Sequence, residues 1–154
     1  MPGTLKAPEV FGFLTPDQVN AISENSAKTR FIDGETIYQK GDPARDFFIV
    51  LDGEVTLRLP GGKGLSVVID QLERGDVFGG PVGPGRSSYA LTATSTGESS
   101  VLRIKAAAMK SLMEADERMG FHLQAHISNA YFNRYLDTMQ KLQAIVMNIP
   151  IESA

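Results

Sequence analysis

The sequence predicts a mainly β domain with flanking helices, built around an antiparallel barrel or jelly roll. Between residues 31 and 104, short runs of β-forming residues alternate with glycine turns, as they do in rolled antiparallel sheets. A capped helix precedes this region, and a long helix with a seven-residue apolar repeat follows it. A chain of 154 residues is large enough to bury a core, so we expect residues 1–154 to form a single domain.

The first expected element is a short helix over about residues 15–28. Thr15 is a good N-cap residue, Pro16 suits the first helical position, and Gln18 completes a capping box. Apolar residues then recur at helical spacing, which supports a helix in this segment.

The roll is expected at about residues 31–104. Asp-Gly and Gly-Asp pairs separate several of its runs, among them Asp33-Gly34 and Asp52-Gly53. Asp-Gly tolerates the positive φ angles of tight hairpins, so we interpret these pairs as turns between strands. The β-rich runs lie at residues 31–32, 35–38, 47–51, 54–59, 65–72, 89–94 and 100–104.

Helices are expected from about residue 105 to residue 148. Ala106–Met113 is rich in helix formers, Gly120 predicts a break, and a long helix follows from Phe121 to Met147. Two positions of a heptad repeat form an apolar seam along it, as in helices that pair with a partner. The seam consists of Phe121, Ser128, Tyr135 and Leu142 at one position, and Ala125, Phe132, Met139 and Val146 at the other. It predicts a dimerisation helix; the alternative is a helix that covers only its own roll.

Composition excludes several classes of protein. The chain has no cysteine, which rules out disulfides, cysteine-held metals and a cysteine nucleophile. No apolar run approaches the roughly 18 residues that span a bilayer, and the start of the chain does not resemble a secretory signal. We therefore expect a cytoplasmic protein that does not contact membranes. The formal net charge is −3 and no basic stripe is visible, so a free-standing nucleic-acid binder is disfavoured.

The most informative stretch runs from Gly75 to Ser88. It predicts the end of a strand, then a loop rich in glycine and proline, then Arg86 beside the hydroxyls of Ser87 and Ser88. Backbone N–H groups, a guanidinium and hydroxyls together suit an anion such as a phosphate. The alternative for Arg86 is a surface arginine at the mouth of a hairpin.

Other residues that could carry chemistry give weaker patterns. His122 and His126 have a spacing that can hold one metal, but no carboxylate completes the set, so we interpret them as solvated or interface side chains. Gly61-Gly62-Lys63-Gly64 lacks the ending of a phosphate loop and lies between strands, which favours a hairpin turn. No histidine precedes residue 121 to assist a serine or to build a cupin-type metal site. We expect no catalytic residue, no metal and no cofactor.

The ordered set of glycines and apolar runs resembles the cyclic-nucleotide-binding domain, which occurs in catabolite-activator-type regulators, kinases and channels. The resemblance covers roughly residues 11–146. It implies an eight-stranded antiparallel β-roll between a short N-terminal helix and a long C-terminal one. The matching segments are Gly34–Ile37, Lys40–Asp42, Phe47–Val55, Leu72–Gly79, Ala93-Thr94 and Val101–Ile104.

In that family, a cassette of Phe-Gly-Glu, a short helix and an arginine holds the cyclic phosphate. The resemblance implies a ligand site made of Phe78, Gly79, Gly80, Val82, Arg86, Ser87 and Ser88, with Tyr135, Thr138 and Met139 of the long helix over the base. Three departures stand out. Gly80 replaces the glutamate that accepts from the ribose, the loop is about three residues shorter than the usual pattern, and its prolines and glycines disfavour the short helix.

The resemblance implies a non-enzymatic sensory or regulatory module that forms a homodimer through its C-terminal helix. Its ligand would be cAMP, cGMP or another small anion, bound weakly or in an altered mode. The alternative is a ligand-free interaction or dimerisation module that kept the fold and lost the site. Catabolite-activator-type regulators continue into a helix-turn-helix, whereas this sequence stops at Ala154, so we expect no DNA binding by this chain alone.

Overall fold

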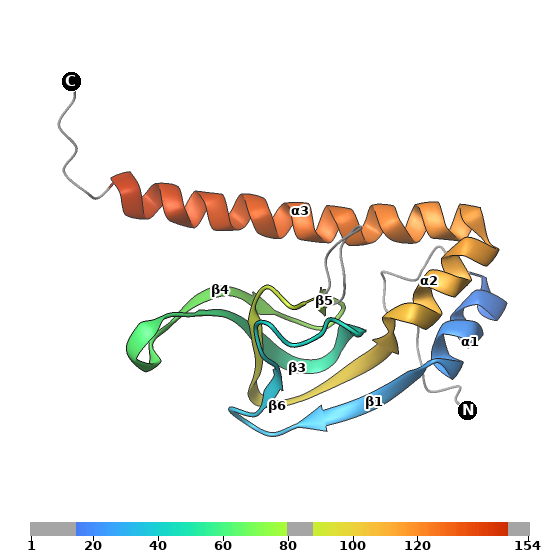
Figure 1. Ribbon diagram of the computed structural model, residues 1–154, viewed down its shortest axis with the longest axis horizontal. Coiled ribbons are helices and arrows are strands. Elements are labelled where there is room, and N and C mark those ends of the chain that lie inside the picture. The colour runs from blue at the N-terminus through green and yellow to red at the C-terminus, as the bar shows by residue number, and fades with distance from the viewer. Residues whose placement is uncertain (1–14, 80–87, 148–154) are drawn as a thin grey trace.

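A curled antiparallel sheet, covered on one side by helices, forms the fold (Figure 1). The computed structural model describes residues 15–79 and 88–147. The described helices are α1 (Pro16–Glu24), α2 (Ala106–Ala115) and α3 (Glu117–Met147). The described strands are β1 (Ser26–Phe31), β2 (Thr36–Tyr38), β3 (Asp46–Pro60), β4 (Ser66–Leu72), β5 (Val77–Gly79) and β6 (Thr92–Lys105).

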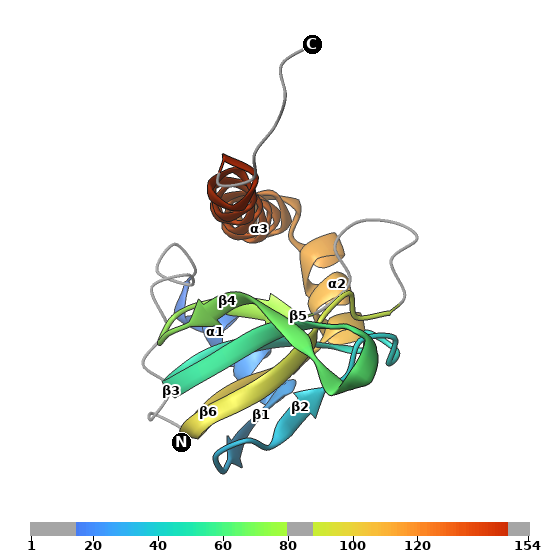
Figure 2. The same cartoon turned by 90° about the vertical axis from the view of Figure 1, so that its left-hand side faces the viewer.

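The two longest strands, β3 and β6, form the centre of the sheet. The strand order is β1-β6-β3-β4, with β2 also paired to β6 and β5 also paired to β3. Every pairing is antiparallel. The sheet curls on itself while α3 lies over its β4 and β5 side (Figure 2), which places the long helix beside the strand that leads into the glycine-rich loop.

Six strands occur in the described residues where the sequence predicted eight. The main difference lies at Asp52-Gly53, which is a register shift inside β3 and not a turn between two strands. The runs expected at residues 89–94 and 100–104 likewise belong to one strand, β6, from residue 92 onward. Positive φ at a glycine serves a β-bulge as well as a hairpin turn, so the Asp-Gly pair could not distinguish the two.

Two of the predicted turns and caps are confirmed. Thr15 and Gln18 form the reciprocal capping box of α1, with Pro16 at its start. Gly62–Gly64 is a short 3-10 turn between β3 and β4, as expected for a hairpin.

The helix boundaries differ from the prediction at two places. α1 ends at Glu24 and not near residue 28, because β1 starts at Ser26 and pairs along its length with β6. Gly120 does not break the long helix, which already begins at Glu117. A Cβ at Gly120 would lie 2.8 Å from the carbonyl oxygen of Met113, so this glycine allows α2 and α3 to approach closely.

The core has two halves because β3 is buried on both faces. Successive side chains on a strand point to opposite faces. Phe48 and Val50 therefore pack inside the roll, while Phe47 and Ile49 pack under the helices. The helix side of this core includes Ile22, Met109, Leu123 and Ile127, so α1, α2 and the first part of α3 share one apolar layer with the sheet.

Candidate functional site

The ends of the glycine-rich loop lie close to the beginning of β3. Gly79 pairs with Phe47, and Phe78 pairs with Phe48. On the other side of the loop, Ser88 forms an isolated bridge with Pro43. The expected ligand residues Gly80, Val82, Arg86 and Ser87 lie outside the described residues, so the structure places the two ends of the expected site.

Gly79 is the last described residue before the loop, and its position requires glycine. Its φ is +70°, in the left-handed region that side chains rarely adopt. A Cβ there would lie 2.8 Å from Cδ2 of Phe48 and 3.2 Å from Cε2 of Tyr38. The chain therefore enters the loop directly above the aromatic interior of the roll.

That interior is an aromatic cluster of Tyr38, Phe48, Phe78 and Tyr89. Phe78 has no exposed surface and stacks on Phe48 with ring centroids 5.1 Å apart. Tyr38 and Tyr89 stack at 3.8 Å. Phe78 precedes the loop and Tyr89 follows it, so packing against this cluster fixes both of its ends.

Side chains of helix α3 bond to β5, the strand that ends at Gly79. The hydroxyl of Tyr131 donates to the carbonyl oxygen of Gly79. Nη2 of Arg134 donates to the carbonyl oxygen of Val77 at 2.9 Å, and its Nε bonds Oδ2 of Asp70 at 3.0 Å. Two side chains of α3 thus donate hydrogen bonds to the first and last residues of β5.

The tyrosines of this region stay neutral donors. Burial raises the pKa of Tyr38 far above its usual value, and the nearby phenols of Tyr131 and Tyr89 raise it further. Burial also raises the pKa of Tyr131, against the opposing effect of the Arg134 guanidinium. A neutral phenol keeps its proton for the bond to Gly79 over the physiological pH range.

The three residues of α3 expected over a ligand lie on two sides of the helix. Thr138 is half-buried on the side of Arg134, whose carbonyl oxygen accepts from its hydroxyl at 2.9 Å. Tyr135 and Met139 are exposed. The helix residues that contact the β4–β5 region are instead Tyr131, Arg134 and Lys141, whose spacing of three and seven residues marks one helical face.

All eight residues of the predicted seam are exposed along α3. The face that packs on the roll is a different one, formed by Leu123, Ile127 and Tyr131. The large exposed side chains of the seam are Phe121, Phe132, Tyr135, Met139, Leu142 and Val146. The seam therefore contributes nothing to the core of the described chain.

Arg103 of β6 is a charged residue near the loop ends that the sequence did not single out. Its guanidinium carbon lies 5.4 Å from the centroid of the Phe48 ring. Nε of Arg103 is buried and has no hydrogen-bond partner among the residues that the structure describes. An arginine within the β-rich run from Ser100 to Ile104 was its only signal in the sequence.

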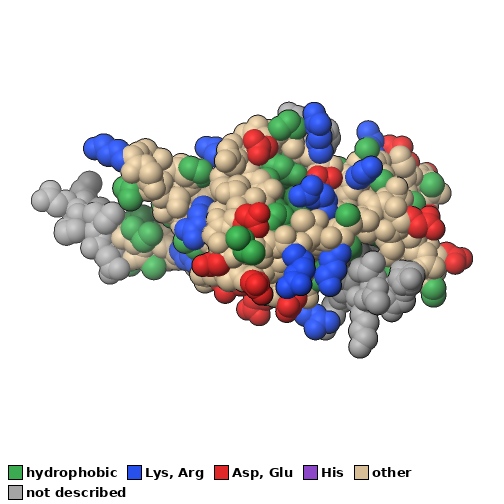
Figure 3. Space-filling view, turned by 90° about the horizontal axis from the view of Figure 1, so that it is seen from below, with side chains coloured by type: hydrophobic (Ala, Val, Ile, Leu, Met, Phe, Trp, Pro, Cys, Tyr) green, Lys and Arg blue, Asp and Glu red, His purple; other side chains and the backbone are tan. Residues whose placement is uncertain are grey.

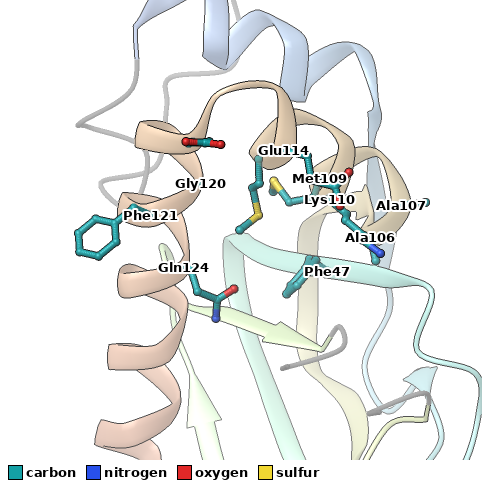
Figure 4. Close-up of a pocket in the computed structure, with 11 residues that line it drawn as sticks. Phe47, Ala106, Ala107, Met109, Lys110, Glu114, Gly120, Phe121 and Gln124 are labelled. Carbon is teal, nitrogen blue, oxygen red and sulfur yellow. The ribbon is translucent and has the colours of Figure 1, made fainter. Parts of the chain in front are cut away.

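An apolar groove of about 920 Å³ lies between α2 and the start of α3. Met109 of α2 and Phe47 of β3 line it, and Gln124 extends from α3 toward it (Figure 4). Lys110, Glu114 and Glu117 contribute charges of both signs. The groove is lined by residues that do not belong to the aromatic cluster of Tyr38, Phe48, Phe78 and Tyr89.

The described residues contain no group of three or more His, Asp or Glu side chains able to hold a metal ion. Among the same residues, no helix is long and apolar enough to cross a membrane. On the face turned away from α3, basic and acidic side chains are interspersed (Figure 3).

The sequence model of the cyclic nucleotide-binding domain family matches residues 28–116, which is more than half of the chain and includes the whole sheet apart from the first two residues of β1. No curated protein matches the sequence significantly.

Solved structures share the fold at low sequence identity. A cyclic nucleotide-binding domain from Methylobacillus flagellatus is 12% identical with a TM-score of 0.77, over 96% of this chain and 84% of that one. The catabolite activator protein of Thermus thermophilus is 17% identical with a TM-score of 0.68, over 91% of this chain and 63% of that one. The regulatory domain of Toxoplasma gondii PKA with cAMP is 18% identical with a TM-score of 0.68, over 84% of this chain and 47% of that one.

Proposed function

The chain belongs to the cyclic nucleotide-binding domain family, a regulatory kind of domain, and from this premise we propose that it is a non-enzymatic sensory module for a small anionic ligand. The proposed ligand is cAMP, cGMP or a related cyclic nucleotide, bound between the loop at residues 80–88 and the roll. One structural neighbour, the Toxoplasma regulatory domain, is a complex with cAMP.

The observation that carries this proposal is the link between α3 and β5. Tyr131 and Arg134 bond the carbonyl oxygens of Gly79 and Val77, at the strand from which the loop departs. A ligand that moves the loop end would change these bonds and hence the position of α3. Such a contact supplies what a sensor needs, because coupling requires that the ligand site and the output element share interactions.

The proposed ligand contacts are Arg86 and Ser87 on the phosphate, with Gly79, Gly80 and Val82 along the loop. Gly80 provides no carboxylate for a ribose hydroxyl. Leaving such a hydroxyl unpaired costs about 1–3 kcal/mol, and about 1.4 kcal/mol corresponds to a tenfold loss of affinity. We therefore expect binding about ten- to hundredfold weaker than a site with that carboxylate would give.

Calorimetric titration with cAMP, cGMP and a cyclic dinucleotide tests the proposal. We expect saturable heat with at least one of them, and its loss in Arg86→Ala. Arg30→Ala is the matched control, because Arg30 lies on β1 and its side chain is 75% exposed. The absence of heat from wild type at millimolar concentrations of all three ligands would contradict ligand binding.

A second candidate function is a dimerisation module, and the exposed seam of α3 favours it. Eight residues at heptad spacing remain uncovered while a separate face of the helix packs on the roll. Long stretches of exposed apolar side chains are typical of interaction surfaces. The two functions are compatible, since α3 can bond β5 with one face and contact a second copy of the chain with the other.

A further inference from the structure

Arg103 lies on the inner side of the roll. Phe48 of β3 pairs with Phe78 of β5 on one side and with Arg103 of β6 on the other. Residues directly opposite each other in antiparallel strands project to the same face of the sheet. The arginine therefore extends over the face on which Phe48 and Phe78 are buried, and its guanidinium carbon lies 5.4 Å from the centre of the Phe48 ring.

Within the described part of the chain, Arg103 forms an ion pair with Asp46. Its Nε is nevertheless buried without a hydrogen-bond partner among the described residues. The carboxylate of Asp46 lies 4.0 Å from that atom, which is beyond hydrogen-bond distance. Native proteins pair nearly all buried donors, and an exception points to strain, to a chemical role or to a bound ion or water.

The guanidinium of Arg103 has the chemistry that an oxyanion requires. The proton of the Tyr89 hydroxyl is already donated to the backbone oxygen of Asp46 at 3.1 Å, so the guanidinium supplies the donors. Two-fifths of the arginine side chain is exposed, so a solute can reach it. A guanidinium presents a planar pair of donors that matches phosphate oxygens.

Arg103 also lies near the place where the loop begins and ends. Phe78 and Tyr89, which flank the loop, both contact Phe48, with ring centroids at 5.1 Å and 6.5 Å. The guanidinium lies over that same Phe48 ring. An anion held by Arg103 would therefore lie in the part of the roll where the loop is anchored.

We propose that Arg103 is an anion-binding residue, whose guanidinium takes a phosphate group on the inner side of the roll. If the phosphate belongs to a cyclic nucleotide, this inference rests on the proposed function. Arg103 then supplies a cation from the sheet itself. The same chemistry would serve inorganic phosphate, which permits a test that needs no nucleotide.

The test measures thermal unfolding in increasing inorganic phosphate, against sodium chloride of equal ionic strength. The variants are Arg103→Met, which keeps an unbranched chain over Phe48, and Arg30→Met as the control on an exposed arginine. We expect phosphate to raise the Tm of wild type and Arg30→Met, and this rise to be lost in Arg103→Met. General salting effects of phosphate act on all three proteins alike, so the difference between variants reports the site.

A purely structural arginine gives a different pattern. Arg103→Met would then lower the Tm equally in both salts and leave the phosphate dependence unchanged, which would overturn the inference. No phosphate-specific rise in wild type would overturn it as well. If Arg103→Met does not fold, the neutral variant Arg103→Gln replaces it, and a phosphate-dependent rise in Tm equal to that of wild type would count against the proposal.

Titration with cAMP separates this inference from the proposed function. If cAMP binds wild type, we expect Arg103→Met to bind it at least about tenfold more weakly. A loss of this size is typical of one charge-assisted hydrogen bond. Unchanged cAMP affinity would contradict Arg103 as a ligand of the nucleotide. If cAMP gives no heat but the phosphate effect still depends on Arg103, the nucleotide function fails and the anion site stands.

Discussion

At the scale of single residues, Gly53 and Gly34 have nearly the same backbone conformation in different surroundings. Their φ angles are +81° and +80°. A Cβ on Gly34 would meet nothing within 4 Å, whereas a Cβ on Gly53 would collide with the carbonyl oxygen of Glu98 and lie 2.8 Å from Cα of Ser99. The two glycines therefore separate the cost of backbone strain from the cost of a steric clash.

We predict that Gly53→Ala lowers the free energy of unfolding by about 2–4 kcal/mol, the sum of left-handed strain and forced separation of packed backbones. Gly34→Ala carries only the strain and should lose about 1 kcal/mol. Urea denaturation of both variants and of wild type measures the difference. Equal losses would show that β6 can move away from Gly53 at little cost.

This pair also shows what a sequence can and cannot specify about a glycine. Asp52-Gly53 and Asp33-Gly34 look alike in the sequence, and both need positive φ. The first lies inside β3 and the second in a turn. The two glycines differ because the backbone of β6, about 45 residues further along the chain, packs against Gly53 and not against Gly34.

At the scale of elements, Asp116 connects the three helices. It lies between α2 and α3, where its Oδ1 accepts from the backbone N–H of Met119 at 3.0 Å. Its Oδ2 accepts from Nε2 of Gln18 in α1 at 2.5 Å. The Met119 bond is the largest cause, and the Gln18 bond the second, that lowers the pKa of Asp116 below its ordinary value of 3.8.

A lowered folded-state pKa means that the stabilisation by Asp116 is complete above the unfolded value and lost as pH falls through the folded one. We predict that wild type is more stable than Asp116→Asn at neutral pH. The two free energies of unfolding should converge as the pH falls below about 4. Denaturant titrations at several pH values measure this convergence.

Gln18→Leu serves as the control for this prediction. It removes the donor to Asp116 and also the capping-box bond from Thr15 N–H, and it keeps the Met119 bond. The lost cap lowers stability at every pH, whereas the lost donor shifts the pH at which stability falls in acid to a higher value than in wild type. A difference between wild type and Asp116→Asn that does not change between pH 7 and pH 3 would contradict the role of the carboxylate charge.

Elements whose signals are local were predictable, and those defined by contacts were not. The capping box of α1 lies within four consecutive residues, and the structure confirms it. Gly120 was interpreted as a helix break because glycine lowers helix propensity. Its actual role depends on Met113 of the neighbouring helix, which no propensity scale contains.

At the scale of the whole molecule, the order of helix, roll and helix followed from periodicity and turns, and the family match agrees with it. The residues of the candidate site were harder to predict from the sequence. Tyr131 of α3 bonds Gly79 at the end of β5, and Arg103 of β6 lies over the Phe48 ring; each was an ordinary residue in its local sequence. Only the pairing of β3 with both β5 and β6 brings Arg103 near Phe78.

The long helix α3 has one face bonded to the sheet and another that is exposed, and the exposed face is available for contact with a second molecule. One face, with Tyr131 and Arg134, is bonded to β5. The other is the exposed seam, where Phe132 and Tyr135 stack at 6.2 Å and Met139 follows one turn later. A second copy of the chain would present the same seam, so an isologous pair of α3 helices can bury both without disturbing the first face.

We predict that wild type is a dimer in solution, with a mass twice the 16.7 kDa of the chain, and that Phe132→Asp combined with Met139→Asp is a folded monomer. Charges placed opposite each other in a buried seam are strongly unfavourable. The matched control is Asn133→Asp with Gln140→Asp, exposed positions with the same seven-residue spacing beside the seam. Light scattering measures mass, and circular dichroism checks the fold. A monomeric wild type, or a control that dissociates as readily as the seam variant, would contradict pairing through this seam.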